Sequence, residues 1–333
     1  MTSTTSQSPV VVGYQDHHSI DALEWACQEA ARRGAPVRVL HAYAREQLYP
    51  WGYGYPLPVG DLASVEEKMR TRASTLLEEA AERVRARHPE LPLTATLAGT
   101  SPDAGLVTAS QDATLLVVGR HDRPPRGASH GSVSLSVAAH AACPVVVVPS
   151  PPAEEVASAG AGGSGDIEVV AHAGPPPPLG ALFAGQVVVG VDDSPEAADA
   201  VGFAFAQASA RGVDLVALHA WWVDPILLAP SMPVDWNEMG AADQGAIDGL
   251  LAPWRARCPD VKVTRILARM GTAEALVTAS SEAELLVVGS RGRGGFARLL
   301  LGSVSRKVLQ HSRCPLAVVR RGQLAALHDL ALS

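Results

Sequence analysis

The sequence has little of what marks secreted, membrane-spanning or nucleic-acid-binding proteins. Its four cysteines stand far apart, without the paired spacing typical of metal or redox sites. The opening MTSTTSQSP lacks the basic start and apolar core of a secretory signal, and no apolar run is long enough to span a bilayer. The net charge of −7 disfavours a general nucleic-acid binder, because phosphate backbones demand a basic surface. We therefore expect a cytoplasmic protein that binds neither membranes nor nucleic acid.

What the chain does contain is one unit repeated twice. The matching segments keep the same order at a nearly constant offset, as expected for a tandem duplication. They are VVVG at 10–13 and 187–190, His-Ala at 41–42 and 219–220, LVTAS at 106–110 and 276–280, LLVVG at 115–119 and 285–289, GSVS at 131–134 and 302–305, and Cys-Pro at 143–144 and 314–315. Both of these Cys-Pro pairs precede apolar runs, so we expect their thiols to be buried.

The length of 333 residues favours about two domains. We place the domains at 1–150 and 186–321. Between them, residues 151–185 form a linker rich in Pro, Gly and Ala, within which 166–170 is a candidate extra strand. Residues 322–333 form a tail.

Each unit alternates short apolar strands with helical segments, a pattern typical of an α/β domain with a parallel sheet covered on both faces. In the first unit we expect strands at 9–14, 37–41, 94–98, 115–119 and 144–148, and helices at 19–33, 61–88, 101–111 and 132–141. The second unit repeats this arrangement from 186 to 320.

The second unit carries a glycine-rich loop between a strand and a helix. Two residues separate Gly289 from Gly292, and nine more precede Gly302-Ser303, which begins a helical segment. Glycines let the backbone approach an anion closely, and the free N–H groups of a helix N-terminus point at it. The loop also has several basic residues, including Arg291. This arrangement favours phosphate binding, although a flexible surface loop with scattered arginines is the alternative.

The glycine spacing resembles the ATP-binding signature of the universal stress protein family, and the resemblance covers nearly the whole chain apart from linker and termini. It implies two Rossmann-like, HUP-type domains, each a doubly wound five-stranded parallel sheet with strand order 3-2-1-4-5. Ligands of such sheets bind beyond the carboxyl ends of the strands.

The resemblance also implies a set of ligand contacts in the second unit. Asp192 would bind the ribose or a metal, and Ala220 would offer its backbone to the adenine. The alternative for Asp192 is a turn or helix-capping carboxylate. The cofactor implied is ATP, with or without Mg²⁺; no catalytic residue and no separate metal site is assigned. The complete set of predicted contacts is Val191, Asp192, Ala220, Gly289, Arg291, Gly292, Gly302, Ser303, Val304 and Ser305.

The first unit departs from this pattern. Asp122 replaces the second glycine, the segment that follows is one residue shorter, and Pro124 and Pro125 remove N–H donors. Gln15 stands where the second unit has Asp192. We therefore expect the first unit to bind ATP weakly or not at all.

We interpret the chain as an ATP-binding regulatory or stress-tolerance protein rather than an efficient enzyme, since no general base or nucleophile pair is evident near the loop. The alternatives are a slow ATPase, a nucleotide-independent scaffold and a cyclic-AMP binder. We expect the last strands of the two units, 145–148 and 316–319, to pair as an internal pseudo-dimer, with further homodimerisation open. Aromatic-rich segments at 49–58 and 221–236 are expected to pack on their own domains, or alternatively to form a lid or a partner-binding surface.

Overall fold

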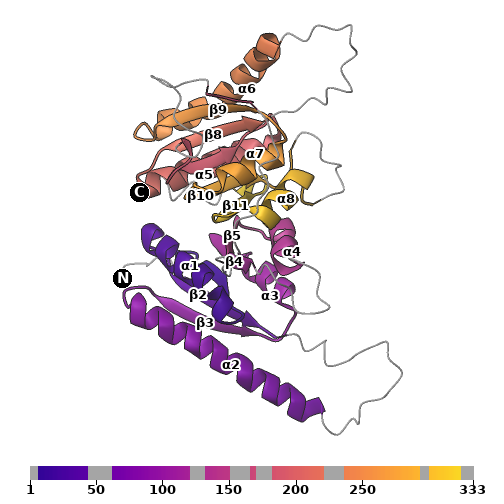
Figure 1. Cartoon of the computed structure of the whole chain (residues 1–333). Helices are drawn as coiled ribbons and strands as arrows, with labels where there is room; N and C mark the ends of the chain where they lie inside the picture. The colour runs from indigo at the N-terminus through magenta and orange to yellow at the C-terminus, as the bar shows by residue number, and fades with distance from the viewer. Residues whose placement is uncertain are drawn as a thin grey trace, which may run out of the picture. The chain divides into compact units, whose positions relative to one another are not determined.

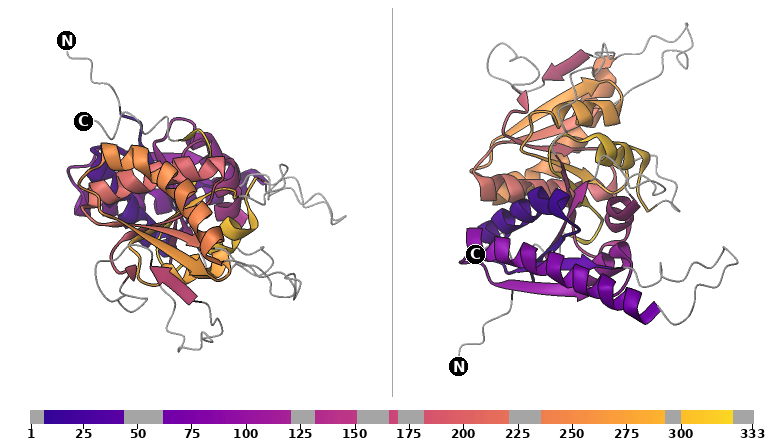
Figure 2. Two further views of the ribbon diagram at one scale, coloured as in Figure 1. Left: turned by 90° about the horizontal axis from the view of Figure 1, so that it is seen from above. Right: turned by 60° about the horizontal axis from the view of Figure 1, so that its bottom comes forward.

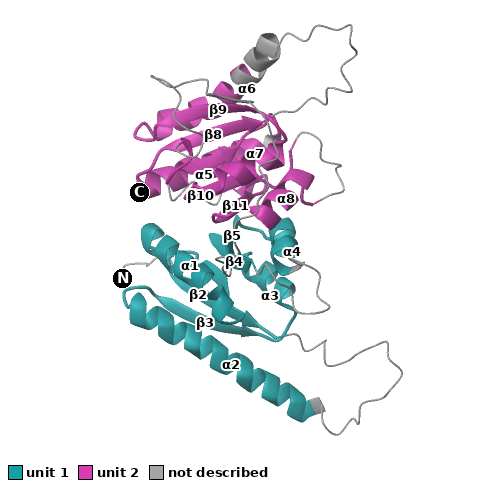
Figure 3. Cartoon of the chain, in the orientation of Figure 1, with its two compact units in different colours: residues 1–151 teal, residues 152–333 magenta. Residues whose placement is uncertain are grey.

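The computed structural model describes residues 7–43, 62–120, 132–150, 166–169, 182–220, 236–292 and 300–323. The chain divides into two compact units, Met1–Pro151 and Pro152–Ser333 (Figure 3). Asp122 and its two neighbouring prolines lie outside the described residues, as do the aromatic-rich segments up to residue 235. Within the described part of the chain, no helix combines the length and the apolar character needed to cross a membrane.

The first unit is an α/β domain whose strands are all parallel and follow the order β3-β2-β1-β4-β5. Helices α1 and α2 contact one another, α3 and α4 contact one another, and each packs on the strands (Figure 1). The predicted elements are confirmed, with bounds that differ by at most two residues. They are β1 Val10–Gly13, α1 Ile20–Arg33, β2 Val37–Ala42, α2 Leu62–Arg87, β3 Leu93–Ala98, α3 Pro102–Ala109, β4 Leu115–Arg120, α4 Ser132–His140 and β5 Val145–Pro149. A 3₁₀ turn that was not predicted, η1 His17–Ser19, precedes α1.

The second unit repeats this order as β9-β8-β7-β10-β11 and adds one strand. Strand β6, Asp166–Val169, pairs antiparallel with the outer edge of β9 (Figure 2). It confirms the candidate strand at 166–170 and adds an edge strand to the five parallel strands expected. The edge of a sheet presents unpaired N–H and C=O groups, which β6 engages. The remaining elements are β7 Val187–Gly190, α5 Pro195–Arg211, β8 Leu215–Ala220, α6 Trp236–Arg257, β9 Val263–Arg269, α7 Thr272–Ala279, β10 Leu285–Gly289, α8 Ser303–His311 and β11 Leu316–Val319.

The repeated VVVG and LVTAS segments meet in the core of each unit. A Cβ added to Gly190 would lie 3.0 Å from Cδ2 of Leu276, and one added to Gly13 would lie 3.1 Å from Cδ2 of Leu106. Both leucines are buried. Glycine at the end of the first strand thus lets a helix pack closely against the sheet, and both copies keep the pair.

In both copies the serine of LVTAS links the end of its own helix to the segment that follows the next helix. The buried Ser110 hydroxyl donates to the Val107 carbonyl at 2.6 Å and accepts the Ala142 N–H at 2.9 Å. Ser280 does the same, donating to its own helix and accepting the Arg313 N–H at 3.0 Å. This side chain satisfies backbone groups that are remote in sequence.

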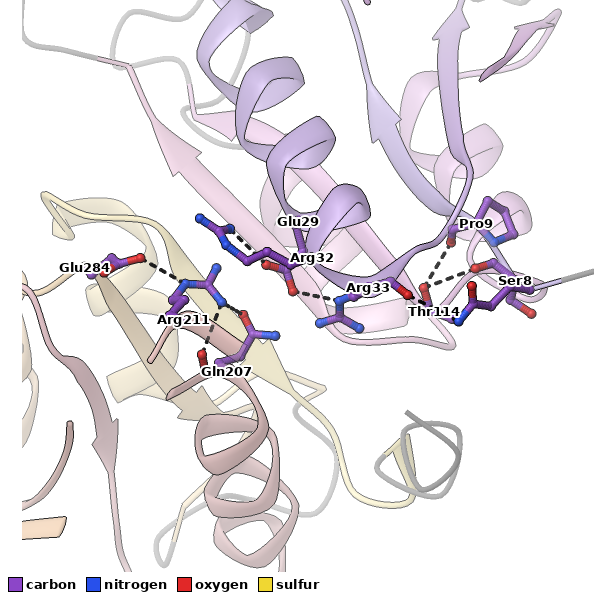
Figure 4. Close-up of polar contacts among 10 residues, drawn as sticks. Ser8, Pro9, Glu29, Arg32, Arg33, Thr114, Gln207, Arg211 and Glu284 are labelled. Atoms are coloured by element: carbon purple, nitrogen blue, oxygen red, sulfur yellow. Dashed lines mark hydrogen bonds and ion pairs between the residues drawn. The ribbon is translucent and has the colours of Figure 1, made fainter. Parts of the chain in front are cut away.

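An arginine ends the first helix of each unit and is held by the residue four positions earlier. Arg33 pairs with the fully buried Glu29 at 2.7 Å, and Arg211 donates to the side chain of Gln207. Arg211 also pairs with Glu284 at 3.1 Å (Figure 4). A cation at the last turn interacts favourably with the helix dipole.

The buried thiols expected from the Cys-Pro pairs are confirmed, since Cys143 is 3% and Cys314 6% exposed. Burial raises the pKa of the Cys143 thiol to about 12. A thiol in this state is protonated at neutral pH and is a poor nucleophile.

Candidate functional site

The two described ends of the glycine-rich loop lie together at the carboxyl end of β10. The Gly302 N–H donates to the Ser290 carbonyl at 2.8 Å, which brings the residue before α8 back to the residue after β10. A Cβ built on Gly302 would lie 3.8 Å from the backbone nitrogen of Gly292. Helix α8 begins at Ser303 with Gly302 as N-cap, as the sequence predicts.

The serine hydroxyls at the start of α8 have different environments. Ser305 is 4% exposed and donates its hydroxyl to the Gly289 carbonyl at 2.7 Å. This hydrogen bond holds α8 against β10, so the Ser305 hydroxyl does not donate its proton to a ligand. Ser303 is exposed at the first helical position and Val304 is half-buried. Of the two predicted serine donors, Ser303 is the one that faces solvent.

Asp192 lies directly against the glycine loop. Its Oδ1 accepts hydrogen bonds from the backbone N–H of Ser194, at 3.1 Å, and from the Ser194 hydroxyl. Its Oδ2 faces Gly292, because a Cβ built on that glycine would lie 2.5 Å from this oxygen. Atoms other than hydrogen-bonding partners do not approach so closely, so a side chain at 292 would force the Asp192 carboxylate to move. The turn role considered for Asp192 is confirmed, and the fold also brings its carboxylate to the loop.

A salt bridge beside the loop was not foreseen. Arg291 pairs with Glu196 at 2.8 Å, and the Glu196 side chain is only 10% exposed. A Cβ on Gly289 would lie 3.3 Å from Cβ of Glu196, so the start of α5 packs closely against the end of β10. The sequence signal was an acidic residue in the first turn of α5. Its pairing with a basic residue that is remote in sequence depends on tertiary structure.

Val191 directly follows β7 and Ala220 ends the neighbouring parallel strand β8, so both lie at the carboxyl ends of these strands. The Val191 N–H donates to the Leu218 carbonyl at 2.9 Å, and the Val191 carbonyl accepts from Nδ1 of His219 at 2.7 Å. Since a carbonyl can only accept, Nδ1 carries the proton. The Ala220 carbonyl accepts from Thr272 at 3.0 Å. Because β7 lies between β8 and β10, Ala220 and the glycine loop flank Asp192 on opposite sides.

The histidines before Ala42 and Ala220 are structural in both units. His41 Nδ1 lies 2.8 Å from the Tyr14 carbonyl, matching His219 and Val191. Burial lowers the pKa of His41, an effect partly offset by this hydrogen bond and by the charge of Asp16. Each histidine is thus a satisfied core residue that fastens the segment after the first strand to the second strand.

The first unit has a different set of groups after its first strand. Gln15, the counterpart of Asp192, is exposed, and its N–H donates to the hydroxyl of Ser19 at 3.0 Å. Asp16 follows with His17 and His18. The first unit thus lacks the carboxylate at the position where the second unit directs one to the glycine loop.

Comparison with known proteins identifies the family to which this two-unit chain belongs. The model of the universal stress protein family matches residues 8–149 and again 184–320. A universal stress protein of Mycobacterium tuberculosis is 35% identical over 326 residues, covering 96% of this chain and 99% of the relative. One from Mycolicibacterium smegmatis is 34% identical, with coverage of 96% and 99%. The chain belongs to the universal stress protein family and contains two tandem copies of its domain.

The fold of the whole chain is also seen in a solved structure. The crystal structure of a universal stress protein from Archaeoglobus fulgidus covers 95% of this chain and 99% of its own, with a TM-score of 0.62 and 18% sequence identity. At this level of identity the likeness concerns the fold.

Proposed function

We propose that the second unit binds ATP, with or without Mg²⁺, beyond the carboxyl ends of β7, β8 and β10. The nucleotide would regulate a cytoplasmic stress-response protein. The observation that carries this proposal is the contact between the Asp192 carboxylate and Gly292, two residues that are 100 positions apart in a chain of 333. A packed core does not need a carboxylate beside a glycine loop, whereas a ribose hydroxyl or a metal-bound phosphate does.

The other predicted contacts support the same pose. Gly302 caps α8, whose first N–H groups point toward the glycine loop, where a phosphate chain would lie. Ala220 offers backbone on the other side of Asp192, where the adenine would lie. Arg291 would stabilise phosphate charge if the nucleotide competes with Glu196 for it.

The site carries no assigned catalytic group, so we propose binding rather than efficient hydrolysis. Phosphoryl transfer relies on positioning and charge stabilisation. Among the described residues near the loop, Asp192 is held by Ser194 and Glu196 by Arg291, so neither acidic residue is an obvious base for activating water.

Calorimetric titration of ATP, with and without magnesium, tests the proposal with three proteins. These are the wild type, Gly292→Asp and the matched control Gly249→Asp. Gly292→Asp introduces the residue that the first unit has, directly against Asp192. Gly249 lies on an exposed part of α6, and a Cβ there meets nothing within 4 Å.

We expect one ATP per chain in the wild type and in Gly249→Asp. Gly292→Asp should weaken binding at least tenfold, or about 1.4 kcal/mol. Two sites per chain would show that the first unit also binds. No binding in the wild type would favour the scaffold alternative, displacement of ATP by equimolar cyclic AMP would favour a cyclic nucleotide, and magnesium-dependent phosphate release that Gly292→Asp abolishes would favour the slow ATPase.

A further inference from the structure

The first unit gathers three metal-ligating side chains just after its first strand. Asp16, His17 and His18 each place a ligand atom within 4.8 Å of the other two. The two imidazole rings lie 3.9 Å apart between centroids and are tilted by 40°. Both histidines are exposed and Asp16 is half-buried. The cluster lies beyond the carboxyl end of β1, at the sequence position that corresponds to Asp193-Ser194-Pro195 in the second unit.

The backbone of this turn is held by several hydrogen bonds. The His18 N–H donates to Oδ1 of Asp16 at 2.9 Å, and the Ser19 N–H donates to the Asp16 carbonyl at 2.9 Å. The Ser19 hydroxyl, in a side chain only 2% exposed, accepts the Gln15 N–H at 3.0 Å. The turn therefore presents both histidines to solvent from a defined backbone.

We propose that Asp16, His17 and His18 bind a divalent transition-metal ion of the Zn²⁺ class. Two imidazoles with one carboxylate suit Zn²⁺, Co²⁺, Ni²⁺ and Cu²⁺, whereas Mg²⁺ and Ca²⁺ prefer all-oxygen ligands. Ligand atoms around tetrahedral Zn²⁺ lie about 3.4 Å apart, given bond lengths of about 2.1 Å. Rotation of the exposed histidine side chains closes the difference from the present spacing. Three protein ligands leave coordination positions open for water or for a ligand from another molecule.

This site is separate from the proposed nucleotide site. The second unit has no histidine at the corresponding positions, and its Asp192 carboxylate faces the glycine loop. The duplicated units thus present different chemistry at corresponding ends of their first strands: two imidazoles with a carboxylate in one copy, and a carboxylate against a phosphate-type loop in the other. The proposed metal site can therefore be tested independently of ATP binding by the second unit.

Titration of Zn²⁺ into the full chain, prepared without a histidine tag, tests this site. Co²⁺ absorption in the visible range gives a second readout, because its bands report coordination by nitrogen and oxygen. The test variants are the double change His17→Ala/His18→Ala and the single change Asp16→Asn, which keeps an oxygen able to accept the His18 N–H. The matched control is His140→Ala, which removes an exposed histidine at the end of α4.

We expect one Zn²⁺ site that the double variant weakens at least tenfold and Asp16→Asn weakens by a smaller factor. His140→Ala should match the wild type. Circular dichroism should show that all variants are folded, since the changed histidines are exposed. Equal Zn²⁺ affinity and equal Co²⁺ spectra in all four proteins would overturn the proposal and assign the binding to other histidines or cysteines. Absence of Zn²⁺ binding in the wild type would overturn it as well.

Discussion

The close contact between Gly190 and Leu276 gives a prediction that tests how the repeat folds. In Gly190→Ala the new methyl group would lie 3.0 Å from one terminal carbon of Leu276 and 3.3 Å from the other. The optimum for two carbons is about 3.5–4.0 Å. Gly190 is half-buried, and its partner Leu276 is packed in the interior at 2% exposure. We expect overpacking to lower the free energy of unfolding by about 1–3 kcal/mol.

A double-mutant cycle separates this mechanism from a general loss of stability. Leu276→Ala alone leaves a cavity and should cost about 2–5 kcal/mol. In the double variant the new methyl group occupies space that the leucine has vacated, so we expect a cost smaller than the sum by about 1–2 kcal/mol. The same cycle with Gly13 and Leu106, where the contact is 3.1 Å, is the internal replicate in the first unit.

The assay is urea unfolding followed by circular dichroism, with the transition of the altered unit fitted separately, because two-domain chains need not unfold in one step. Additive costs, within about 0.5 kcal/mol, would refute the reasoning. They would mean that the sheet or helix shifts to accept the methyl group without involving the leucine.

Three further predictions concern the repeated serine, a carboxylate and the thiols. Ser280→Ala should lower the free energy of unfolding by about 1–3 kcal/mol, since it removes the acceptor of the Arg313 N–H, and an unchanged urea midpoint would contradict this. A hydrogen bond from Ser101, with another from Ser136, lowers the pKa of Asp103, so its stabilisation is present above its ordinary pKa and lost as pH falls through the lower folded pKa. Asp103→Asn should therefore flatten the fall in melting temperature between about pH 5 and pH 2, and an unaltered profile would argue against it. A thiol reagent at neutral pH should modify the half-buried Cys258 before the three buried cysteines, which mass spectrometry of partially labelled protein would show; one common rate would contradict the burial argument.

Much of the fold could be predicted because its signals are local. Apolar runs such as 10–13 and 115–119 indicate buried strands. Because the unit is duplicated, most elements are indicated twice along the chain. Edge strand β6 was predicted only as a candidate, because its residues 166–169 lie in a segment whose composition is that of a linker. Its pairing depends on the free edge of β9, which exists only once the sheet has formed.

The candidate site was predicted in part. The glycine spacing indicated the loop, and Gly302-Ser303 indicated the start of α8. The direction of the Ser305 hydroxyl into the protein was not predictable, because its acceptor is the Gly289 carbonyl on a neighbouring strand. The pairing of Arg291 with Glu196 was not predicted either, because these residues are remote in sequence and meet only when the domain folds.

The sequence by itself determined the duplication, the alternation of strands and helices, the family, and the divergence of the two glycine loops. Each of these follows from composition and spacing along the chain. Tertiary structure alone decided which remote groups meet, namely Asp192 with Gly292 and Arg291 with Glu196. The physical reason is that such contacts depend on strand order and side-chain direction, which are set when the whole sheet packs and not by any short stretch of sequence.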